Sequence, residues 1–291
     1  MFCIPALYPS NLSSVVLSIL ASIYTIRIYE MGEIHNKSRT KELPIILMLH
    51  GDGANGNIFK FQTAKIRHLL RLQYQFVFVD GPVRARPGPG VVPFFRGWGP
   101  FRRWVRENIP GTEEERRNRF EDDQAAAGEA LEKTLREFDA KVVGVMGFSI
   151  GGGVAAALLQ RAQQVKPSNE GWHERAKAWG DIEFGVFLMG VPPARDADEF
   201  DDNLPKIRLP TVHVYGLRDP WLEQSRALLN DYSEGSIRDH CTLEFDVGHE
   251  INFTDEQHKS IVDAILNAAE RGKKLKDSTS NSVTNGKYCQ D

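Results

Sequence analysis

The sequence is poor in cysteine and in net charge, and each shortage excludes a class of protein. Its 291 residues include three cysteines, and 36 Lys and Arg face 39 Asp and Glu. So few cysteines, with no CxxC pair and no histidine cluster beside them, give neither a disulfide framework nor a metal site. We therefore expect a cytoplasmic protein without a metal ion. The near-balance of charge argues against nucleic acid as a partner, because such binding needs a concentrated basic surface.

Long hydrophobic runs are also scarce, and the longest lies close to the amino terminus. Residues 12–28 are mostly apolar but contain serines and Arg27, whereas a membrane-spanning helix needs about 20 predominantly apolar residues. Residues 1–40 therefore form an extension with three open interpretations. The segment is an anchor or targeting signal, or it lies upstream of a true first residue at Met31, or it is a loosely docked helix. Membrane contact is expected only if residues 12–28 insert.

What the sequence does contain is a predicted strand, tight turn and small-residue helix over residues 142–157, VVGVMGFSIGGGVAAA. Residues 147–151 fit G-x-S-x-G, the nucleophile elbow, whose turn strains the serine backbone and exposes its hydroxyl. Ser149 is therefore the candidate nucleophile. Amides at the start of the following helix favour a developing oxyanion, and we assign this role to the backbone N–H of Ile150. The alternative is a glycine-rich turn capped by a serine.

A second polar loop follows the predicted buried strand at residues 44–50, PIILMLH. The loop HGDGANGN begins at the end of this strand, where a hydrolase of this kind places its second oxyanion donor. We assign that donor to the backbone N–H of Asp52. Its carboxylate is expected to point away, because it would oppose a developing anion. The alternative is a simple turn.

An aspartate and a histidine each follow a later predicted strand. Asp219 comes after residues 210–216, and His249 comes after residues 241–247. The order Ser, Asp, His is that of the triad in hydrolases with a nucleophile elbow, so Asp219 is the candidate acid and His249 the candidate general base. The alternatives are a helix cap for the aspartate and a structural role for the histidine. Two other histidines are weaker candidates for the base, His240 and His258.

An unusual stretch, residues 83–106, holds six arginines and no acidic residue, interleaved with aromatic side chains, proline and glycine. It is too long and irregular for a plain connection. We predict a cap over the active site, in which aromatic side chains line an acyl pocket and arginines face an anionic part of the substrate or its carrier. The alternatives are a nucleic-acid surface and a solvated loop. The predicted pocket residues are Phe94, Phe95, Trp98 and Trp104.

The rest of the pattern alternates apolar strands with helices, which predicts an α/β domain with a mainly parallel sheet and helices on both faces. We place this domain over residues 41–271, with a cap-like insert at about 83–121. Residues 272–291 are rich in Lys, Ser and Asn and are expected to form a disordered tail. Because ligands bind at the carboxyl ends of such strands, the three candidate catalytic residues are expected to meet at one rim.

Several of these motifs together resemble one known family. HGDGANG after the first strand, VDGP after the second, GFSIGG at the elbow, PTVHVYGLRD and the final GH are similar to the fungal FSH family of serine hydrolases, over about residues 43–270. This family includes a polyketide-releasing thioesterase. The resemblance implies an α/β-hydrolase fold with Ser149, Asp219 and His249 as the catalytic triad. Relatives usually have Gln where Ile150 stands, but an oxyanion hole needs only the backbone of that residue.

We therefore predict a serine hydrolase that cleaves an ester or thioester through an acyl-serine intermediate, without a metal or organic cofactor. The resemblance implies a small-molecule acyl substrate from fungal polyketide biosynthesis, either free or carried by an acyl carrier protein of a synthase. One alternative is a general carboxylesterase acting on short-chain esters. A second is a non-catalytic binding protein that kept the fold.

Overall fold

The computed structural model describes most of the chain beyond the amino-terminal extension. The described residues are 43–107, 110–138, 140–164, 181–192, 205–234 and 240–285. The predictions for the extension and for the last six positions of the chain lie outside these ranges. Among the helices in the described ranges, none is both long enough and apolar enough to cross a bilayer.

A parallel six-stranded sheet forms the centre of the domain, which confirms the predicted mainly parallel sheet. The strand order is β2-β1-β5-β6-β7-β8. Strands β1, β5, β6 and β7 are buried along their whole length, because helices cover both faces and the strands are continuously apolar. The strands are β1 (Ile45–Leu49), β2 (Gln75–Val79), β5 (Val142–Phe148), β6 (Phe184–Leu188), β7 (Thr211–Gly216) and β8 (His240–Phe245).

Strand β1 lies between β2 and β5, so the strand order reverses at this point in the sheet. Such a reversal is a topological switch point, and ligands of open parallel sheets bind outside the carboxyl ends of the strands that flank it. The loop after β1 carries Asp52, and the turn after β5 carries Ser149. The sheet order therefore brings these two candidate residues to the same end of neighbouring strands.

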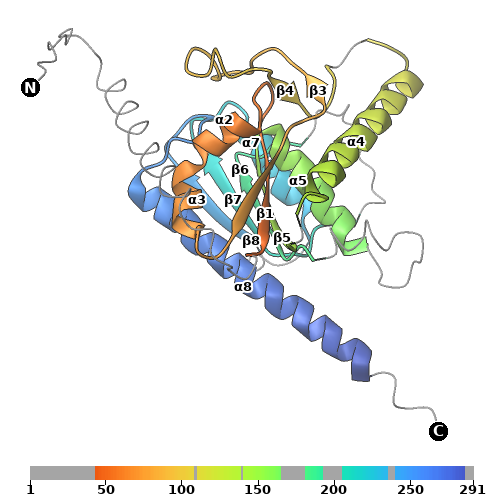
Figure 1. Cartoon of the computed structure of the whole chain (residues 1–291), viewed down its shortest axis with the longest axis vertical. Coiled ribbons are helices and arrows are strands. Elements are labelled where there is room, and N and C mark those ends of the chain that lie inside the picture. Colours follow the sequence, from red (N-terminus) through yellow and green to blue (C-terminus); the bar gives the residue numbers. More distant parts are fainter. Residues whose placement is uncertain are drawn as a thin grey trace, which may run out of the picture. The chain divides into compact units, whose positions relative to one another are not determined.

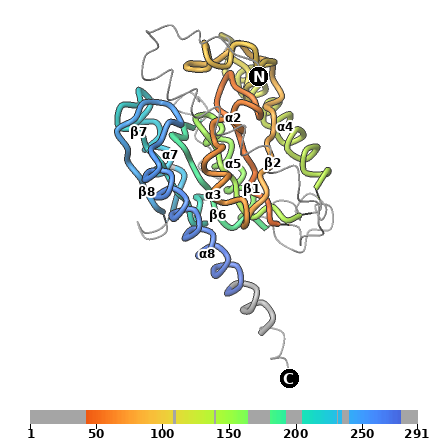
Figure 2. The backbone as a smooth tube through the Cα atoms, turned by 60° about the vertical axis from the view of Figure 1, so that its left-hand side comes forward, coloured from red at the N-terminus to blue at the C-terminus, as the bar shows by residue number. Residues whose placement is uncertain are grey.

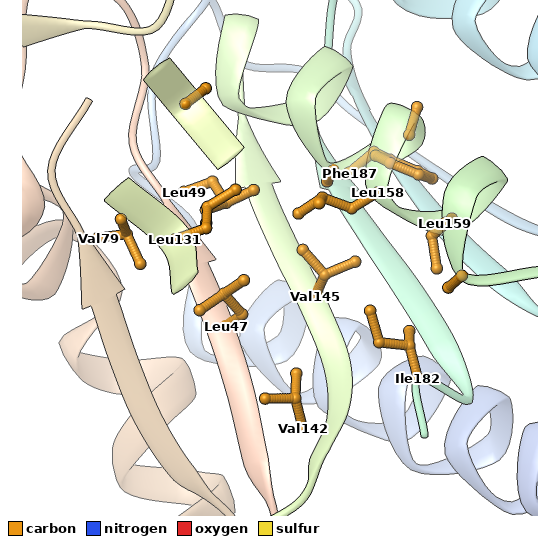
Figure 3. Close-up of a cluster of buried hydrophobic side chains, with 14 of the residues drawn as sticks. Leu47, Leu49, Val79, Leu131, Val142, Val145, Leu158, Leu159, Ile182 and Phe187 are labelled. Carbon is orange, nitrogen blue, oxygen red and sulfur yellow. The ribbon is translucent and has the colours of Figure 1, made fainter. Parts of the chain in front are cut away.

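Helices pack on both faces of the sheet, as Figure 1 shows. One face carries α4 (Glu113–Leu135), α5 (Ile150–Gln164) and α7 (Leu222–Tyr232), and the other carries α2 (Gly56–Gln62), α3 (Ala64–Leu70) and α8 (Asp255–Asn285). Figure 3 shows the core under the first set, where Val145 of β5 lies between Leu47 of β1 and Leu158 of α5. In Figure 2, α3 and α8 lie side by side over the opposite face.

The last part of the predicted insert is the start of a long helix. Helix α4 begins at Glu113 behind a capping box, in which Thr112 Oγ1 accepts from the Glu115 N–H at 3.2 Å and the Glu115 carboxylate accepts from the Thr112 N–H at 2.8 Å. The box satisfies the N–H groups that a helix start leaves without intrahelical partners. Residues 113–121, which the predicted insert included, are therefore helical.

The insert itself contains a two-stranded antiparallel ribbon, β3 (Val83–Arg84) and β4 (Arg102–Arg103). The Arg102 N–H donates to the Ala54 carbonyl at 2.7 Å, and the Gly88 N–H donates to the Gly53 carbonyl at 3.1 Å. These backbone bonds attach the ribbon and its neighbouring turn to the loop after β1. The insert thus packs against one of the two loops that form the candidate site.

Helix α8 is longer than predicted. It continues to Asn285, so residues 272–285 are helical where the composition predicts a disordered tail. A Cβ at Gly272 would stand 2.0 Å from the Glu183 carbonyl oxygen, so only glycine lets α8 pass so close to the start of β6. Burial lowers the pKa of Lys276 one turn later, and the nearby carboxylate of Glu183 opposes that shift. These contacts with the folded body give the helix the partners that composition alone does not reveal.

Candidate active site

The turn after β5 has the geometry that the G-x-S-x-G motif predicts. Ser149 has φ 55°, in the left-handed region that non-glycine residues rarely adopt. A Cβ at Gly147 would stand 2.1 Å from the Gly151 carbonyl oxygen, and one at Gly151 would stand 2.3 Å from that of Leu49. The two glycines therefore allow the strand, the helix and β1 to approach closely around the strained serine. The Ser149 N–H donates to the Leu188 carbonyl at 3.2 Å, which helps hold this conformation.

Asp219 and His249 meet although 30 residues separate them, because β7 and β8 are neighbours in the sheet. His249 Nδ1 lies 2.7 Å from Asp219 Oδ2, and the Asp219 side chain is fully buried. The other carboxylate oxygen accepts the Trp221 N–H at 2.8 Å. An ionised carboxylate only accepts hydrogen bonds, so we assign the imidazole hydrogen to Nδ1. That tautomer leaves the Nε2 lone pair free to accept a proton.

Two aromatic rings hold the His249 imidazole in place. The Phe148 ring centroid lies 4.9 Å from that of His249, and the Trp221 centroid lies 4.6 Å away in an edge-on arrangement. Phe148 directly precedes Ser149, so the histidine ring packs beside the elbow. In the described residues the pairing of Asp219 with His249 is a direct hydrogen bond, whereas none joins the Ser149 hydroxyl to His249. Such nucleophile-to-base bonds are often long in enzymes without bound substrate.

The two candidate oxyanion donors belong to loops that touch at the switch point. A Cβ built on Gly51 would lie 3.2 Å from the Ser149 Cβ, so the loop before Asp52 lies against the nucleophile. Ile150 is the first residue of α5, where the N–H groups have no intrahelical acceptor. The Asp52 carboxylate forms an ion pair with Arg103 at 3.1 Å. This pairing directs the carboxylate to the insert, the arrangement expected of a residue that uses its amide at the site.

His50 is a structural connection that the sequence analysis missed. Its Nδ1 lies 2.7 Å from the Gly51 carbonyl, and its Nε2 accepts the Gly81 N–H at 2.9 Å. The His50 carbonyl accepts the Trp104 Nε1–H at 2.8 Å, which joins β1, the loop after β2 and the insert. Burial lowers the pKa of His50 from 6.5 to about 4, and the nearby Arg102 charge adds to that shift. A neutral ring can serve as donor and acceptor at once, which is what both contacts require.

The four aromatic residues predicted to line one pocket lie in different places. Trp104 is fully buried, whereas Phe94 is 59% exposed and Trp98 is 42% exposed. Phe95 and Trp98 pack edge-on against Phe61 of α2, with ring centroids 5.5 Å from it in each case. The insert therefore lays part of its aromatic surface on α2. Contact of these four side chains with a substrate stays a prediction.

An apolar cavity lies between α4 and α5, on the face of the sheet below the elbow. Its volume is about 70 Å³, several times the roughly 10–15 Å³ that a single water molecule needs. Gly153 and Val154 line it about one helical turn beyond Ser149, and Trp104 lines it from the insert. Gly128 of α4 also lines it, and a Cβ built there meets nothing within 4 Å. The cavity thus begins close to the elbow and has room at α4.

The two weaker histidine candidates lie elsewhere. His240 Nδ1 lies 2.6 Å from the Thr211 hydroxyl, in a buried cluster with His213, and His258 Nδ1 lies 2.8 Å from the Thr254 carbonyl. Both histidines therefore have structural partners: Thr211 of the neighbouring strand β7 for His240, and Thr254, just before α8, for His258. Within the described ranges, no group of three His, Cys, Asp or Glu side chains is placed to hold a metal ion.

Comparison with known proteins gives matches over this same part of the chain. Residues 40–261 match the family described as "Serine hydrolase (FSH1)". The chain is 35% identical to Esterase FUS5 of Gibberella moniliformis over 222 residues, which cover 76% of this chain and 85% of that protein. It is also 35% identical to Esterase citA of Monascus ruber over 236 residues, covering 73% and 87%.

Solved structures resemble the fold at low sequence identity. The structure of YahD with malic acid matches with a TM-score of 0.52 at 13% identity, covering 80% of this chain and 97% of that chain. A likeness at this identity concerns the fold alone. The α/β-hydrolase architecture expected from the sequence is therefore confirmed.

Proposed function

The chain belongs to the FSH1 family of serine hydrolases, and from this premise we propose that it cleaves its ester or thioester through an acyl intermediate on Ser149. The observation that carries the proposal is the 2.7 Å contact of Asp219 with His249 beside the strained elbow. Ser149 is the nucleophile, His249 the general base and Asp219 the residue that orients it. Each stands on a loop directly after a parallel strand, so the sheet itself holds the three at one rim.

A serine hydroxyl is a poor nucleophile at its own pKa and needs a base during attack. His249 Nε2 takes the hydroxyl proton as Ser149 Oγ bonds to the acyl carbon, and the imidazolium then donates that proton to the leaving alcohol or thiol. Asp219 holds the hydrogen on Nδ1 and stabilises the positive ring. In the second half of the reaction, His249 Nε2 takes a proton from water as the water oxygen attacks the acyl-serine. The imidazolium then donates that proton to Ser149 Oγ, which releases the acid and restores Ser149.

The tetrahedral intermediate carries a negative oxygen, and we assign the amides of Asp52 and Ile150 to stabilise it. One such donor contributes about 3–4 kcal/mol to the transition state when it is well aligned. Support comes from their position on either side of the switch point and from the Asp52 carboxylate, which is engaged by Arg103. A carboxylate free to turn inward would oppose the oxyanion.

The cavity between α4 and α5 is our candidate for the acyl chain. Its lining is largely apolar, and it begins about one helical turn from the nucleophile. Hydrocarbon chains bind where apolar surface is removed from water. The position of Trp104, which lines the cavity and bonds to the His50 carbonyl, links this site to the loop that carries Asp52. We infer a preference for medium or long acyl chains.

The resemblance of the motifs to a family with a polyketide-releasing thioesterase supports a substrate from fungal secondary metabolism, free or carried by an acyl carrier protein. A general short-chain carboxylesterase is the alternative. Comparing kcat/KM for acyl thioesters with kcat/KM for short oxygen esters separates them: we expect the thioesters to be preferred. The cysteine usage of the chain supports a cytoplasmic setting.

Covalent labelling tests the proposed nucleophile. We expect a fluorophosphonate probe to label wild-type protein at Ser149, located by mass spectrometry, and to leave the Ser149→Ala variant unlabelled. Wild-type protein that is folded and unlabelled would instead support a binding protein that kept the fold. Labelling of a different serine would remove Ser149 from the mechanism.

A further inference from the structure

The arginines of the insert fall into two groups. Arg103 forms ion pairs with Asp52 at 3.1 Å and Glu107 at 2.8 Å, and Arg106 forms one with Asp123 at 2.7 Å. For the other four, no ion pair is present within the described ranges. These are Arg84, Arg86, Arg96 and Arg102. The insert thus presents positive charge that the described part of the chain does not neutralise.

Two of these charges face each other across the ribbon. In the register of β3 and β4, Arg84 lies directly opposite Arg102, and Val83 lies opposite Arg103. Directly opposed residues of an antiparallel pair have Cβ atoms about 5 Å apart on the same face, and like charges there destabilise the pair. Asp52 neutralises Arg103, whereas Arg84 and Arg102 form a like-charged pair. A bound anion between the two guanidinium groups would remove that repulsion.

The pair stands beside the reaction centre. The Arg102 N–H bonds to the Ala54 carbonyl at 2.7 Å, two residues beyond the proposed oxyanion donor Asp52. The charge of Arg102 also reaches His50, whose pKa it lowers together with burial. In addition, Arg102 Nε is shielded from water and has no hydrogen-bond partner in the described residues. A buried donor without an acceptor is costly, so an acceptor supplied by a ligand is favoured.

We propose that Arg84 and Arg102 form an anion-binding subsite that holds a phosphate or carboxylate group of the substrate while its ester or thioester bond lies at Ser149. The inference rests on the proposed function, because it places the anion relative to the scissile bond. Guanidinium groups bind phosphate and carboxylate through paired, charge-assisted hydrogen bonds. A carrier arm with a thiol and a phosphate is one source of the anion, and an acyl chain that carries a free acid is the other.

Two matched substrate pairs separate these sources. Hexanoyl-phosphopantetheine and hexanoyl-pantetheine differ only in the phosphate, and the mono-p-nitrophenyl ester of adipic acid differs from p-nitrophenyl hexanoate in its carboxylate. We expect wild-type protein to prefer the anionic member of at least one pair in kcat/KM. We express this preference as the ratio of kcat/KM for the anionic substrate to kcat/KM for its neutral counterpart. Arg84→Gln and Arg102→Gln are each expected to lower this preference ratio about tenfold, mainly through KM, the loss typical of one charge-assisted contact.

The matched control is Arg136→Gln. Arg136 follows the carboxyl end of α4, just before β5 begins, so it belongs to the opposite rim of the sheet. The Arg136→Gln substitution removes the same charge far from the proposed subsite, and we expect the preference for the anionic substrate in kcat/KM to stay within about twofold of wild type. Arg84→Lys, which keeps the charge without the planar fork, is expected to retain part of the preference. Raising the salt concentration from about 0.05 M to about 0.5 M should reduce the preference of wild type as well.

A binding measurement keeps the proposal separate from catalysis. Calorimetry with the Ser149→Ala protein compares the dissociation constants of phosphopantetheine and pantetheine, and of monomethyl adipate and methyl hexanoate, with and without Arg84→Gln. If Arg84→Gln weakens the affinity for phosphopantetheine relative to pantetheine, the anion is the phosphate of the carrier arm. If it weakens the affinity for the ligand with the free carboxylate relative to its neutral partner, the anion is the acid of the acyl chain. Ratios that no arginine variant changes, in turnover and in binding, overturn the subsite even if neutral esters are hydrolysed. Arginine-dependent binding of the anionic ligands without any turnover would support the anion subsite and contradict the proposed hydrolytic function.

Discussion

The rim of the sheet and the insert meet at the active site, yet they are held in different ways. Backbone contacts hold the rim: Gly147 and Gly151 bring strand and helix together too closely for any side chain, and adjacent strands bring Asp219 to His249. The insert is attached by side chains as well as by its backbone bonds to the loop after β1: Asn55 Nδ2, for example, donates to the Trp98 carbonyl at 2.6 Å. The difference suggests a division of labour, with chemistry on the rim and substrate choice on the insert and α4.

The strongest loss of activity is expected from a change at the rim. Replacing Ser149 with Ala removes the proposed nucleophile, and we expect kcat for a p-nitrophenyl ester to fall by about six orders of magnitude. Ser260→Ala on the exposed face of α8 is the matched control, and it should leave kcat unchanged. Turnover of the Ser149→Ala variant at the wild-type rate would show that Ser149 is not the nucleophile.

The next effect concerns Asp219, the residue proposed to orient the general base. In Asp219→Asn the carboxylate is replaced by an amide whose NH₂ group can donate to the imidazole, so the ring is stabilised in the wrong tautomer. We expect kcat to fall by about four orders of magnitude. Asp246→Asn is the control, since Asp246 is exposed and pairs with Arg218 at the surface. A loss smaller than about tenfold would show that the 2.7 Å contact with His249 is structural.

Lowering the pH should reduce the free energy of unfolding through His50, which connects β1, the loop after β2 and the insert. The pKa of His50 is lowered from 6.5 to about 4, so between these values the unfolded chain binds the proton more tightly than the folded one. Stability is therefore full above about pH 6.5 and is lost as the pH falls towards 4. The shift corresponds to about 3 kcal/mol of unfolding free energy.

Urea unfolding across this pH window checks the expectation. The His50→Gln variant does not titrate at this position, so its unfolding free energy should depend less on pH than that of wild type. His213, whose burial lowers its pKa to about 3, remains in both proteins and its contribution cancels. Equal pH dependence in the two proteins would show that His50 does not carry the effect.

A smaller effect sharpens the role assigned to α4. Gly128→Leu extends a side chain into the cavity between α4 and α5, where a Cβ meets nothing within 4 Å. We expect the ratio of kcat/KM for p-nitrophenyl laurate to that for p-nitrophenyl butyrate to fall about tenfold, because the long chain loses apolar contact. If the ratio stays the same, the acyl chain binds elsewhere.

The smallest expected effect comes from the matched control, Gly128→Ala. Alanine in a helix interior is favoured over glycine by about 0.5–1 kcal/mol, and the open space around this position permits the extra methyl group. We expect the unfolding free energy to rise by that amount while the chain-length ratio stays near wild type. A destabilised Gly128→Ala protein would mean that α4 packs more tightly here than the cavity indicates.

The motifs of the sequence predicted the backbone geometry of the elbow, whereas the arrangement of side chains in the insert could not be read from the sequence, for a physical reason. The strained turn at Ser149 follows from the G-x-S-x-G pattern, whose glycines leave room for it, and the positions of Asp219 and His249 follow from the strands before them. The aromatic residues of the insert, at positions 94, 95, 98, 101 and 104, recur at nearly helical intervals. The prolines and glycines among them interrupt any regular helix, so this spacing does not separate buried Trp104 from exposed Trp98. The structural role of His50 was missed because its partners come from the loop after β2 and from the insert.

The nucleophile elbow, the parallel strands and the order of the candidate catalytic residues follow from the sequence alone, since these depend on local backbone preferences and on short apolar runs. Which side chains meet depends on the way the chain folds in three dimensions. The bond of Asp219 to His249, the opposed pair Arg84 and Arg102, and the continuation of α8 past Gly272 all require contacts between segments distant in the chain. Such contacts depend on sheet order and packing, which local sequence patterns do not encode.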